Sequence, residues 1–575
     1  MNQYLPASHY NIWGLIKLYW KSDQRKHAYI FFAVAMGMTV SLVAFEVVFN
    51  YWYNYFYDAL QNYNRELAMK LMLAFVGIAT IYIILAVYRF YIAQLFGLRW
   101  RKWLTQQFLG RWLEHKAYYN LESFDEKTDN PEQRIQEDIA SIVSYSIQLS
   151  IGLVSAVTTF CAFVFILWSL SGPLILPLGS LGVLHIPAYL VWVSILYAFA
   201  GSYFTVKLGK PLVPLNFEQQ RREATFRFAA TDLRSHAEHV ALYDGEQQQK
   251  KTLNVLFQMV IDNWYLILIR QKKLLWFTSA YGQTAVILPL LVALPNYFDR
   301  VFMLGGLMQT IRAFGSVQDS ISFLVNSYVE IAQWQAVGQR LTTFVNHMHD
   351  VTEKTEAINK LKTIQRPGNE ITASNVNLSL PDGKQLLTNI NETFVHGRHY
   401  LLKGDSGVGK STFIKALAGI WPYAEGDVIF PSKQSIMFVS QKAYMPIGPL
   451  SEAILFPDDD SYALRPAIED ALRKCHLDYL IPKLNETATW SEKLSPGEQQ
   501  RVAFARVLLH KPDWVFMDES TSMLDMANED YLYRMLKKEL PNCSIISIGH
   551  RPSLDVHHDE VVDMTMFKAK ASVEA

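Results

Sequence analysis

Long apolar stretches occupy much of the first 330 residues of this chain of 575. A helix needs about 20 mostly apolar residues to cross the hydrocarbon core of a bilayer. Six stretches meet that length, at residues 27–50, 68–92, 149–171, 185–206, 274–295 and 302–325. One such stretch is also typical of a buried helix in a soluble protein, but six with few internal charges predict a membrane domain over residues 1–350.

The sixth stretch is the least apolar, because it contains Arg312, Gln318 and Asp319. Charged side chains inside a membrane are costly unless they face protein or water. We therefore expect this helix to border a protein-lined or water-filled cavity.

Polar side chains recur on the first and sixth stretches: Glu46, Asn50, Gln318, Asp319, Ser322 and Asn326. They favour a hydrated cavity, with hydrogen bonding between helices as the alternative. Glu46 is suited to carrying a proton or contacting a cationic solute. Its place near the outer end of the span makes a plain interfacial role the stronger expectation.

Lys and Arg gather before the first span, between the second and third, and between the fourth and fifth. Because cytoplasmic loops retain positive charge, these segments are expected on the cytoplasmic side. The apolar run after residues 17–26 is too long for a cleaved signal peptide, so the chain is expected to begin with a span whose start stays inside.

The two long basic connections have helical character. We expect spans two to five to continue beyond the bilayer as one helix each, with turns near residues 132–139 and 222–243 that transmit movement. A separate soluble domain inserted here is disfavoured, because neither connection has a strand pattern.

The pattern changes after residue 350. Short β-rich runs at 400–403, 435–439, 514–517 and 544–548 alternate with helical stretches and glycine-marked turns. This alternation is typical of a mostly parallel α/β sheet. The expected fold is a multi-domain membrane protein, with an all-α six-helix domain followed by an α/β domain over residues 351–575.

Composition supports a membrane protein and excludes other classes. Charged residues make up 18% of the chain, against about 25% in soluble domains. The formal net charge is zero, so no global basic field indicates a nucleic-acid partner. Cys161, Cys475 and Cys543 lack metal-site spacing and are expected to be ordinary buried thiols.

A phosphate-loop pattern follows the apolar run at 400–403 and precedes a helical stretch. Its residues are Gly404, Asp405, Ser406, Gly407, Val408, Gly409, Lys410 and Ser411, with Thr412 next in the chain. Glycines let the backbone approach phosphates, while amides and the helix N-terminus supply positive potential. Lys410 would reach the terminal phosphates and Ser411 would bind Mg²⁺, so ATP and Mg²⁺ are the expected cofactors.

Two adjacent carboxylates follow the apolar run at 514–517. Asp518 is placed to hold Mg²⁺ through water, and Glu519 to orient or deprotonate the attacking water. An apolar run that ends in Asp-Glu is common by itself and usually marks a strand end. Together with the phosphate loop, it predicts ATP hydrolysis.

With these motifs in this order, the second domain resembles the ATP-binding cassette superfamily. The stretch 494–501, LSPGEQQR, looks like the family signature, although Pro496 replaces a glycine and Glu498 a glutamine. The resemblance implies that Ser495, Gly497 and Glu498 contact the γ-phosphate bound by the opposite subunit of a homodimer. No aromatic residue stands between residues 371 and 393, where the family often stacks adenine, so selectivity for ATP over GTP stays open.

The same resemblance implies roles for three further positions. Gln441 matches the glutamine that senses metal and water, and His550 the histidine that contacts the γ-phosphate. The stretch 522–525, which ends in Asp525, matches a loop at the dimer contact. The implied catalytic residues are thus Glu519, His550 and Gln441, with Ser411, Gln441 and Asp518 around the metal.

The membrane half also resembles known families. Stretches 50–61, 98–104 and 130–135 look like the SbmA/BacA-like bacterial uptake proteins and their cassette-fused relatives of the YddA type. The architecture is also similar to the peroxisomal subfamily D half-transporters of fatty-acyl groups. The first resemblance implies uptake of peptides, cobalamin or other hydrophilic solutes across a bacterial inner membrane. The second implies an acyl-chain cargo. The alternative to a transporter is a channel or regulator that ATP gates.

Overall fold

The computed structural model describes residues 9–124, 130–171, 174–177, 183–458 and 464–569. The chain divides into two compact units. One is helical and comprises Met1–Tyr118 with Glu126–His349. The other comprises Tyr119–Asp125 with Asp350–Ala575 and contains the larger sheets.

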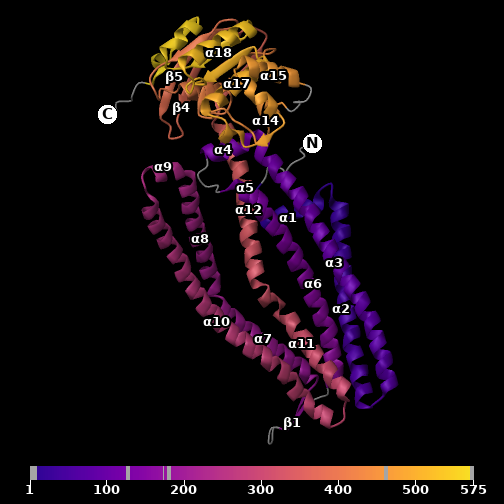
Figure 1. Cartoon of the computed structure of the whole chain (residues 1–575). Helices are drawn as coiled ribbons and strands as arrows, with labels where there is room; N and C mark the ends of the chain where they lie inside the picture. Colours follow the sequence, from indigo (N-terminus) through magenta and orange to yellow (C-terminus); the bar gives the residue numbers. More distant parts are fainter. Residues whose placement is uncertain (1–8, 125–129, 172–173, 178–182, 459–463, 570–575) are drawn as a thin grey trace. The chain divides into compact units, whose positions relative to one another are not determined.

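Long helices run through the first unit (Figure 1). Its elements are α1 (Ile12–Lys21), α2 (Arg25–Gln61), α3 (Arg65–Leu113), η1 (Glu114–Lys116), α4 (Ala117–Phe124), α5 (Pro131–Gln133), η2 (Arg134–Asp138), α6 (Ile139–Leu170), β1 (Leu174–Pro177), β2 (Val183–Ile186), α7 (Tyr189–Gly209), α8 (Leu212–Ser235), α9 (Ala237–Leu242), α10 (Glu246–Phe298), α11 (Leu304–Asn326) and α12 (Tyr328–Ile358). The last residues of α4 and of α12 belong to the second unit.

Asparagine caps mark the starts of two helices. The Asn11 side chain accepts a hydrogen bond from the amide of Gly14 at the start of α1, and Asn64 accepts one from Leu67 at the start of α3. Such caps satisfy amides that have no partner inside the helix. The polar residues between apolar runs therefore fix where these helices begin.

Five helical stretches in the described residues are long and apolar enough to cross a membrane. They are Arg25–Gln61, Arg65–Phe124, Pro131–Leu170, Tyr189–Ser235 and Glu246–Phe298. The sixth expected span forms the 23-residue helix α11, which packs against α2, α6 and α7 but does not reach the same hydropathy. Its role as a membrane span stays a prediction, in keeping with its charged residues.

The expected fourth span begins four residues later than predicted and is continuous to its predicted end. Residues 183–186 form strand β2, which pairs antiparallel with β1, and helix α7 begins only at Tyr189. Pro187 explains the late start, because a proline disfavours helical backbone in the residue before it. The expected single helix then breaks between α7 and α8 at Pro211, which lacks an amide hydrogen and crowds the preceding turn.

The other extensions are continuous. Helix α3 spans 49 residues and α10 spans 53, and α8 runs alongside α10 (Figure 1). Cys475 and Cys543 are buried as expected, whereas Cys161 is exposed on α6. The expectation was wrong for Cys161 because a membrane helix presents one face to lipid, where no protein covers it.

The second unit is built on two sheets. The five-stranded sheet has the order β13-β6-β12-β11-β8 with every pairing parallel. Its strands are β6 (Tyr400–Lys403), β8 (Ile436–Val439), β11 (Trp514–Asp518), β12 (Ser544–Ile548) and β13 (Glu560–Asp563). The parallel α/β sheet predicted from the sequence is therefore confirmed. Strand β12 is buried along its whole length, as expected for an apolar run inside a sheet covered on both faces.

A four-stranded sheet of order β3-β7-β4-β5 packs beside it. Its strands are β3 (Lys360–Arg366), β4 (Glu370–Ser379), β5 (Gln385–Val395) and β7 (Ala424–Pro431), and a short ladder joins β9 (Gly448–Pro449) to β10 (Thr487–Ala488). The helices of this unit are α13 (Lys410–Leu417), α14 (Leu450–Leu455), α15 (Arg465–Lys474), η4 (Asp478–Lys483), α16 (Trp490–Lys493), α17 (Pro496–His510), α18 (Met526–Glu539), η5 (Pro552–His557) and η6 (Met564–Phe567).

The core of this unit lies on both faces of the parallel sheet. One cluster packs Trp514 and Phe516 against Phe413 of α13, and the other packs Val515 and Met517 against helices α14 to α18. Side chains of β11 alternate between the two clusters, so this strand joins the halves of the core. The sheet edge at its carboxyl end is held rigidly, and the candidate site lies there.

Candidate functional site

The phosphate-loop residues connect β6 to α13. Gly404, Gly407 and Gly409 have φ angles of 144°, 78° and 113°, a region that residues with a side chain rarely adopt. At Gly409 an added Cβ would also lie 3.3 Å from Leu387. Ser411 and Thr412 then occupy the first turn of α13. The loop therefore turns tightly and aims its amides as a phosphate cradle requires.

Lys410 lies inside this loop and is only 5% exposed. Its Nζ donates to the carbonyl oxygens of Gly404 and Asp405 at 2.8 and 3.0 Å. Burial lowers the pKa of the Lys410 ammonium, although the carboxylates of Glu519 and Asp518 oppose the shift. Phosphate oxygens are stronger acceptors for this charge than carbonyls, so the position suits a phosphate ligand.

Ser411 and Asp518 meet at the carboxyl end of β11. The Ser411 hydroxyl donates to Asp518 Oδ1 at 2.8 Å. Burial raises the pKa of the Asp518 carboxyl, while the hydrogen bond from Ser411 lowers it. A hydroxyl and a carboxylate are hard oxygen donors of the kind that Mg²⁺ takes together with nucleotide phosphates, so these two residues fit the expected metal.

Glu519 gathers two of the other predicted residues. Gln441 Nε2 donates to Glu519 Oε2 at 2.9 Å, and His550 Nε2 lies 3.5 Å from Glu519 Oε1. The backbone of Glu519 has a φ of 46°, which is rare for a residue with a side chain. The structure thus brings Glu519, Gln441 and His550 together next to Asp518 and Lys410.

The signature residues form a helix start. Ser495 caps α17: its hydroxyl accepts from the Glu498 amide, and its own amide donates to Glu498 Oε2 at 2.7 Å. This reciprocal pair is a capping box, and proline is favoured at the first helical position. The two departures from the commonest signature therefore make a well-formed helix terminus. Gly497 follows, and a Cβ there would lie 3.2 Å from the Met523 carbonyl oxygen.

Glu498 is also held from outside the helix. Tyr479 donates its hydroxyl to Glu498 Oε1. Burial raises the pKa of the Glu498 carboxyl, but hydrogen bonds from Tyr479 and Ser495 outweigh it and leave that pKa below its usual value. In the described part of the chain these bonds tie Ser495 and Glu498 to each other and not to the phosphate loop of the same chain.

Asp525 caps the following helix. Its carboxylate accepts from the Asn528 amide at 2.8 Å at the start of α18, and this hydrogen bond keeps its pKa low. The structure thus gives Asp525 a local structural partner, and its expected contact with nucleotide or with a second subunit stays a prediction.

Sequence reasoning missed the residues that hold these loops together. Gln500 donates from Nε2 to the Gln441 carbonyl at 3.2 Å and accepts from the Met523 amide at 3.0 Å. Arg551 donates to the carbonyl oxygens of Ser522 and Leu524 at 2.9 and 2.6 Å. Both lie directly beside a motif residue, Gln500 in the signature stretch and Arg551 after His550, and this adjacency was the available signal.

A second cluster of predicted residues lies in the helical unit. A cavity of about 550 Å³ lies between α2, α6 and α11. It is lined by Glu46, Phe49, Asn50, Gly152, Ser155, Ala156, Thr159, Phe163, Arg312, Ser316, Asp319, Ser320, Phe323 and Asn326. On each helix these positions recur at spacings of three and four residues, which places them on one face. The polar cavity expected from the sequence thus contains Glu46, Asn50, Asp319 and Asn326, while Gln318 and Ser322 are not among its lining residues.

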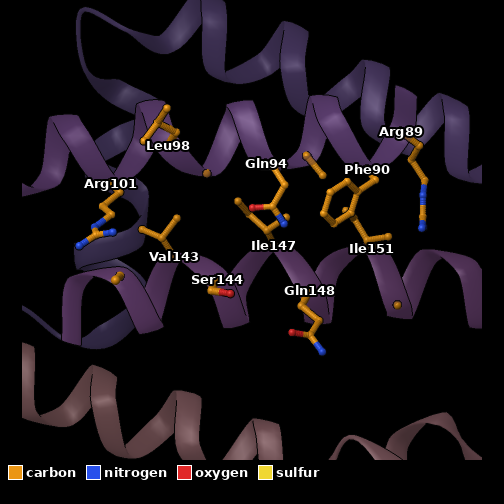
Figure 2. Close-up of a pocket in the computed structure, with 14 residues that line it drawn as sticks. Arg89, Phe90, Gln94, Leu98, Arg101, Val143, Ser144, Ile147, Gln148 and Ile151 are labelled. Carbon is orange, nitrogen blue, oxygen red and sulfur yellow. The ribbon is translucent and has the colours of Figure 1, made fainter. Parts of the chain in front are cut away.

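A neighbouring cavity of about 680 Å³ lies between α3 and α6 (Figure 2). Arg89 and Arg101 stand at its two ends, with Phe90 and Gln94 between them on α3. Its α6 residues run from Ala140 to Gly152, and the α6 residues of the first cavity continue from Gly152 to Phe163. The two cavities therefore follow one another along the same face of α6.

The stretch 50–61 clamps α2 to α11. Asn50 Nδ2 donates to the Gln309 carbonyl at 3.1 Å, and Asp58 Oδ1 accepts from the Gly305 amide at 2.7 Å. Gln61 accepts from the Leu304 amide at 2.7 Å in the same way. The two helices touch closely, because a Cβ on Gly305 would lie 1.9 Å from a backbone oxygen of Asn54. These polar residues thus position α11, and with it one wall of the cavity.

Comparisons with known proteins match both units. The family model for ABC transporter transmembrane region 2 matches residues 15–298, and the model for ABC transporter matches residues 387–522. The resemblances drawn from the motifs are therefore confirmed at the level of the family.

Full-length relatives give the same result. The chain is 35% identical to an uncharacterized ABC transporter ATP-binding protein of Haemophilus influenzae over 92% of its length and 88% of the relative's. It is 32% identical to the inner membrane ABC transporter ATP-binding protein YddA of Escherichia coli over 96% of both chains. It is 29% identical to the chloroplastic ABC transporter D family member 2 of Arabidopsis thaliana over 96% of this chain and 86% of that one.

Proposed function

The chain belongs to the ATP-binding cassette transporters, ATPases that couple hydrolysis to transport, and on that premise we propose that it takes up hydrophilic solutes across a bacterial inner membrane. Peptides and cobalamin are the candidate solutes. The observation that carries the proposal is the cavity between α2, α6 and α11, where hydroxyl, amide and charged side chains outnumber apolar ones. Such groups would be costly against lipid or an acyl chain and favourable around a hydrated solute.

The ATP chemistry follows from the grouping around Glu519. Gly404 to Thr412 would hold the phosphates, and Ser411 with Asp518 and Gln441 would surround Mg²⁺. Glu519 would take the proton of the attacking water, which Gln441 and His550 help to place. Electrostatic stabilisation of the transferred phosphoryl group would come from Lys410 and the loop amides.

The working form would be a homodimer. Ser495 and Gly497 stand at the start of α17, and a helix N-terminus attracts a phosphate. If they act on nucleotide bound by another copy, two chains form two sites related by twofold symmetry. Asp525 would contribute to the same interface, and each dimer would bind two ATP molecules.

The inner-membrane location is supported by YddA, whose name places it there, and by the apolar helices. The D-family relative favours a second candidate, movement of fatty-acyl amphiphiles, since it matches nearly the whole chain. An ATP-gated channel or regulator is the candidate from another class.

Transport in sealed vesicles separates these functions. Purified protein is reconstituted with its cassettes outward, and labelled cobalamin, a hydrophilic peptide and an acyl-CoA are offered in separate trials. In this orientation the outside solution corresponds to the cytoplasm, so an exporter would move label into the lumen and an importer would move it out of the lumen. Each label is therefore tested once inside and once outside the vesicles. We expect ATP-dependent loss of a hydrophilic label from the lumen against its gradient.

The Lys410→Ala variant serves as the control without hydrolysis. Equilibration that stops at equal concentrations would indicate a channel and contradict the proposal. Accumulation of the acyl-CoA alone would support the second candidate instead.

A further inference from the structure

The cavity between α2, α6 and α11 holds charged groups of both signs, with carboxylates in excess. Glu46 on α2 and Asp319 on α11 supply two carboxylates, against one guanidinium from Arg312. We propose that Glu46, Asp319 and Asn50 form a subsite for an organic cation, meaning a protonated amine or guanidinium group of the solute. This inference rests on the proposed uptake function and names the chemistry that its cavity selects.

The two carboxylates have no ion-pair partner among the described residues. Neither Glu46 nor Asp319 lies within ion-pair distance of a basic side chain in the described part of the chain. A charge kept inside a membrane protein without a partner costs free energy, and such groups are generally functional. A bound cation would supply the missing partner.

Asn50 gives a second and independent indication. It lines the cavity and is only 1% exposed, and its Nδ2 is used by the Gln309 carbonyl. Its Oδ1 has no hydrogen-bond partner. Because Nδ2 must face a carbonyl, the side-chain amide cannot be turned around, and the orphaned atom is an acceptor. A ligand that satisfies it must donate hydrogen, as ammonium and guanidinium groups do.

Arg312 contacts the Tyr53 ring and is not paired with the carboxylates of the cavity among the described residues. Its guanidinium lies 3.7 Å from the centre of the Tyr53 ring, which is a cation–π arrangement. Tyr53 thus holds part of the positive charge of Arg312 against an aromatic face. The carboxylates of Glu46 and Asp319 and Asn50 Oδ1 remain available to accept hydrogen bonds from a ligand. The N–H groups of Arg312 could donate to a carboxylate or carbonyl of the same solute.

The neighbouring cavity has the opposite charge. It presents Arg89 and Arg101 and no carboxylate, and Arg89 Nε is buried without a partner. Since the cavities follow one another along α6, an anionic amphiphile would be repelled from the one that contains Glu46 and Asp319. A cation would be repelled from the cavity with Arg89 and Arg101 in the same way, so the cation subsite is confined to the cavity between α2, α6 and α11.

The test compares charge preference in the full-length protein reconstituted in nanodiscs. Stimulation of ATP hydrolysis is measured with three peptides of equal length, trilysine, triglutamate and trialanine, and with spermidine as a cation without a peptide backbone. We expect trilysine to stimulate at a concentration at least about tenfold lower than trialanine, and triglutamate to stimulate least. Equal stimulation by spermidine would identify the amine as the recognised group, whereas a requirement for trilysine would add the peptide backbone.

Isosteric variants link the preference to these residues. Glu46→Gln and Asp319→Asn should each weaken the trilysine response by about tenfold relative to the trialanine response of the same variant. Glu66→Gln is the matched control, because Glu66 is an exposed carboxylate paired with Lys70 outside the cavity. The thermal midpoint of each variant reports folding. Glu46→Lys should reverse the preference towards triglutamate, which misfolding cannot produce.

The outcomes separate the two levels of the proposal. If the three peptides stimulate wild-type protein equally, or if Glu46→Gln and Asp319→Asn leave the trilysine preference intact, the cation subsite is wrong while uptake stands. If vesicle assays show that no hydrophilic solute moves but trilysine still binds selectively, the proposed uptake function is wrong and the subsite stands.

Discussion

At the scale of single residues, the nucleotide site is organised around Glu519. Its left-handed backbone conformation costs on the order of 1–3 kcal/mol and persists only where the surroundings enforce it. The enforcement is visible in the Glu519 amide, which donates to the Ile548 carbonyl at 3.1 Å, and in the Gln441 and His550 contacts of the carboxylate. The surrounding contacts therefore fix the position of Glu519, which distinguishes it from an acidic residue that merely ends a strand.

Replacing Glu519 by Gln tests its role as the base. The side chain keeps its size, so nucleotide binding should persist, while steady-state hydrolysis should fall by about 10²-fold or more because general-base catalysis is lost. The measurement is phosphate release together with equilibrium binding of a fluorescent ATP analogue. Glu492→Gln, an exposed change on α16, is the control, and wild-type turnover in Glu519→Gln would refute the assignment.

His558 predicts how the cassette responds to acid. It is buried, its Nδ1 donates to the Leu554 carbonyl, and its Nε2 accepts from Ser547 at 3.0 Å. Burial lowers the pKa of this imidazole to about 4, below the about 6.5 of an unfolded chain. Between these values the unfolded state binds more protons, so stability should fall as pH drops from about 6.5 towards 4.

Thermal unfolding of the purified protein, followed by tryptophan fluorescence from pH 7.5 to 5, measures this effect. A loss on the order of 1 kcal/mol per pH unit is expected from His558. His558→Gln should flatten the pH dependence even if it lowers the midpoint at pH 7.5. An unchanged slope in the variant would show that other groups carry it.

At the scale of elements, the α2–α11 clamp shows how a polar motif inside a membrane domain is used. Residues 50, 54, 58 and 61 lie on one face of α2, and the side chains there bond the backbone or side chains of α11. Asp58 and Gln61 satisfy the first amides of α11, which have no partner within their own helix. The clamp thus orients the helix that carries Arg312 and Asp319.

Alanine substitutions at two glycines of α11 test whether α2 and α11 cross closely at the clamp. Gly305→Ala would place a methyl group 1.9 Å from the Asn54 carbonyl oxygen, whereas Gly315→Ala meets nothing within 4 Å. The first should cost about 1–3 kcal/mol through overpacking, and the second should be neutral or slightly stabilising. The thermal midpoint and solute-stimulated ATPase activity are the measurements. Equal behaviour of the two variants would contradict the close crossing.

The sequence predicted some elements better than others, for physical reasons. The phosphate loop, β11 and the cluster at Glu519 were accessible because local spacing and strand order determine them. The start of α7 and the break at Pro211 were missed because apolar content was weighed above proline chemistry. Gln500 and Arg551 stand beside motif residues, but the loops that they bridge are remote in sequence, so their hydrogen-bond partners could not be predicted.

The predicted role of residues 132–139 and 222–243 in transmitting movement stays a prediction. The sequence placed one such segment near residues 132–139, where the structure has the π-helical turn η2. The sequence did not predict that Tyr119 to Phe124 belong to the second unit, where the Phe124 ring packs 5.8 Å from Trp421 and 5.6 Å from Tyr423. An aromatic contact between distant segments is not visible in hydropathy, so the sequence could not locate it.

At the scale of the whole molecule, the capping box that ties Ser495 to Glu498 has a consequence for the proposed assembly. In the proposed homodimer, ATP bound by Lys410 of one chain would meet Ser495 of the second chain. Lys410→Ala and Ser495→Ala variants, each inactive by itself, should regain part of the ATPase activity when co-expressed and purified as a mixed dimer. The mixed dimer then contains one site with both groups intact.

The recovery distinguishes action between subunits from action within one chain. If Ser495 served its own chain, every site in the mixed dimer would carry a defect and no activity would return. The control is a dimer of two Lys410→Ala chains that carry different affinity tags and are purified in the same way. Full activity in a stable monomer would contradict the dimer as a whole.

Helix α10 runs for 53 residues without interruption, a rod of about 80 Å. A rod of this length is a lever: tilting it by one degree about one end sweeps the other by about 1.4 Å. Pro289 and Pro295 lie in its last three turns, and proline is the usual cause of a kink in a helix, so the preceding residues keep an unbroken hydrogen-bond ladder. A small rotation at one end of α10 would therefore move the other end by several ångströms.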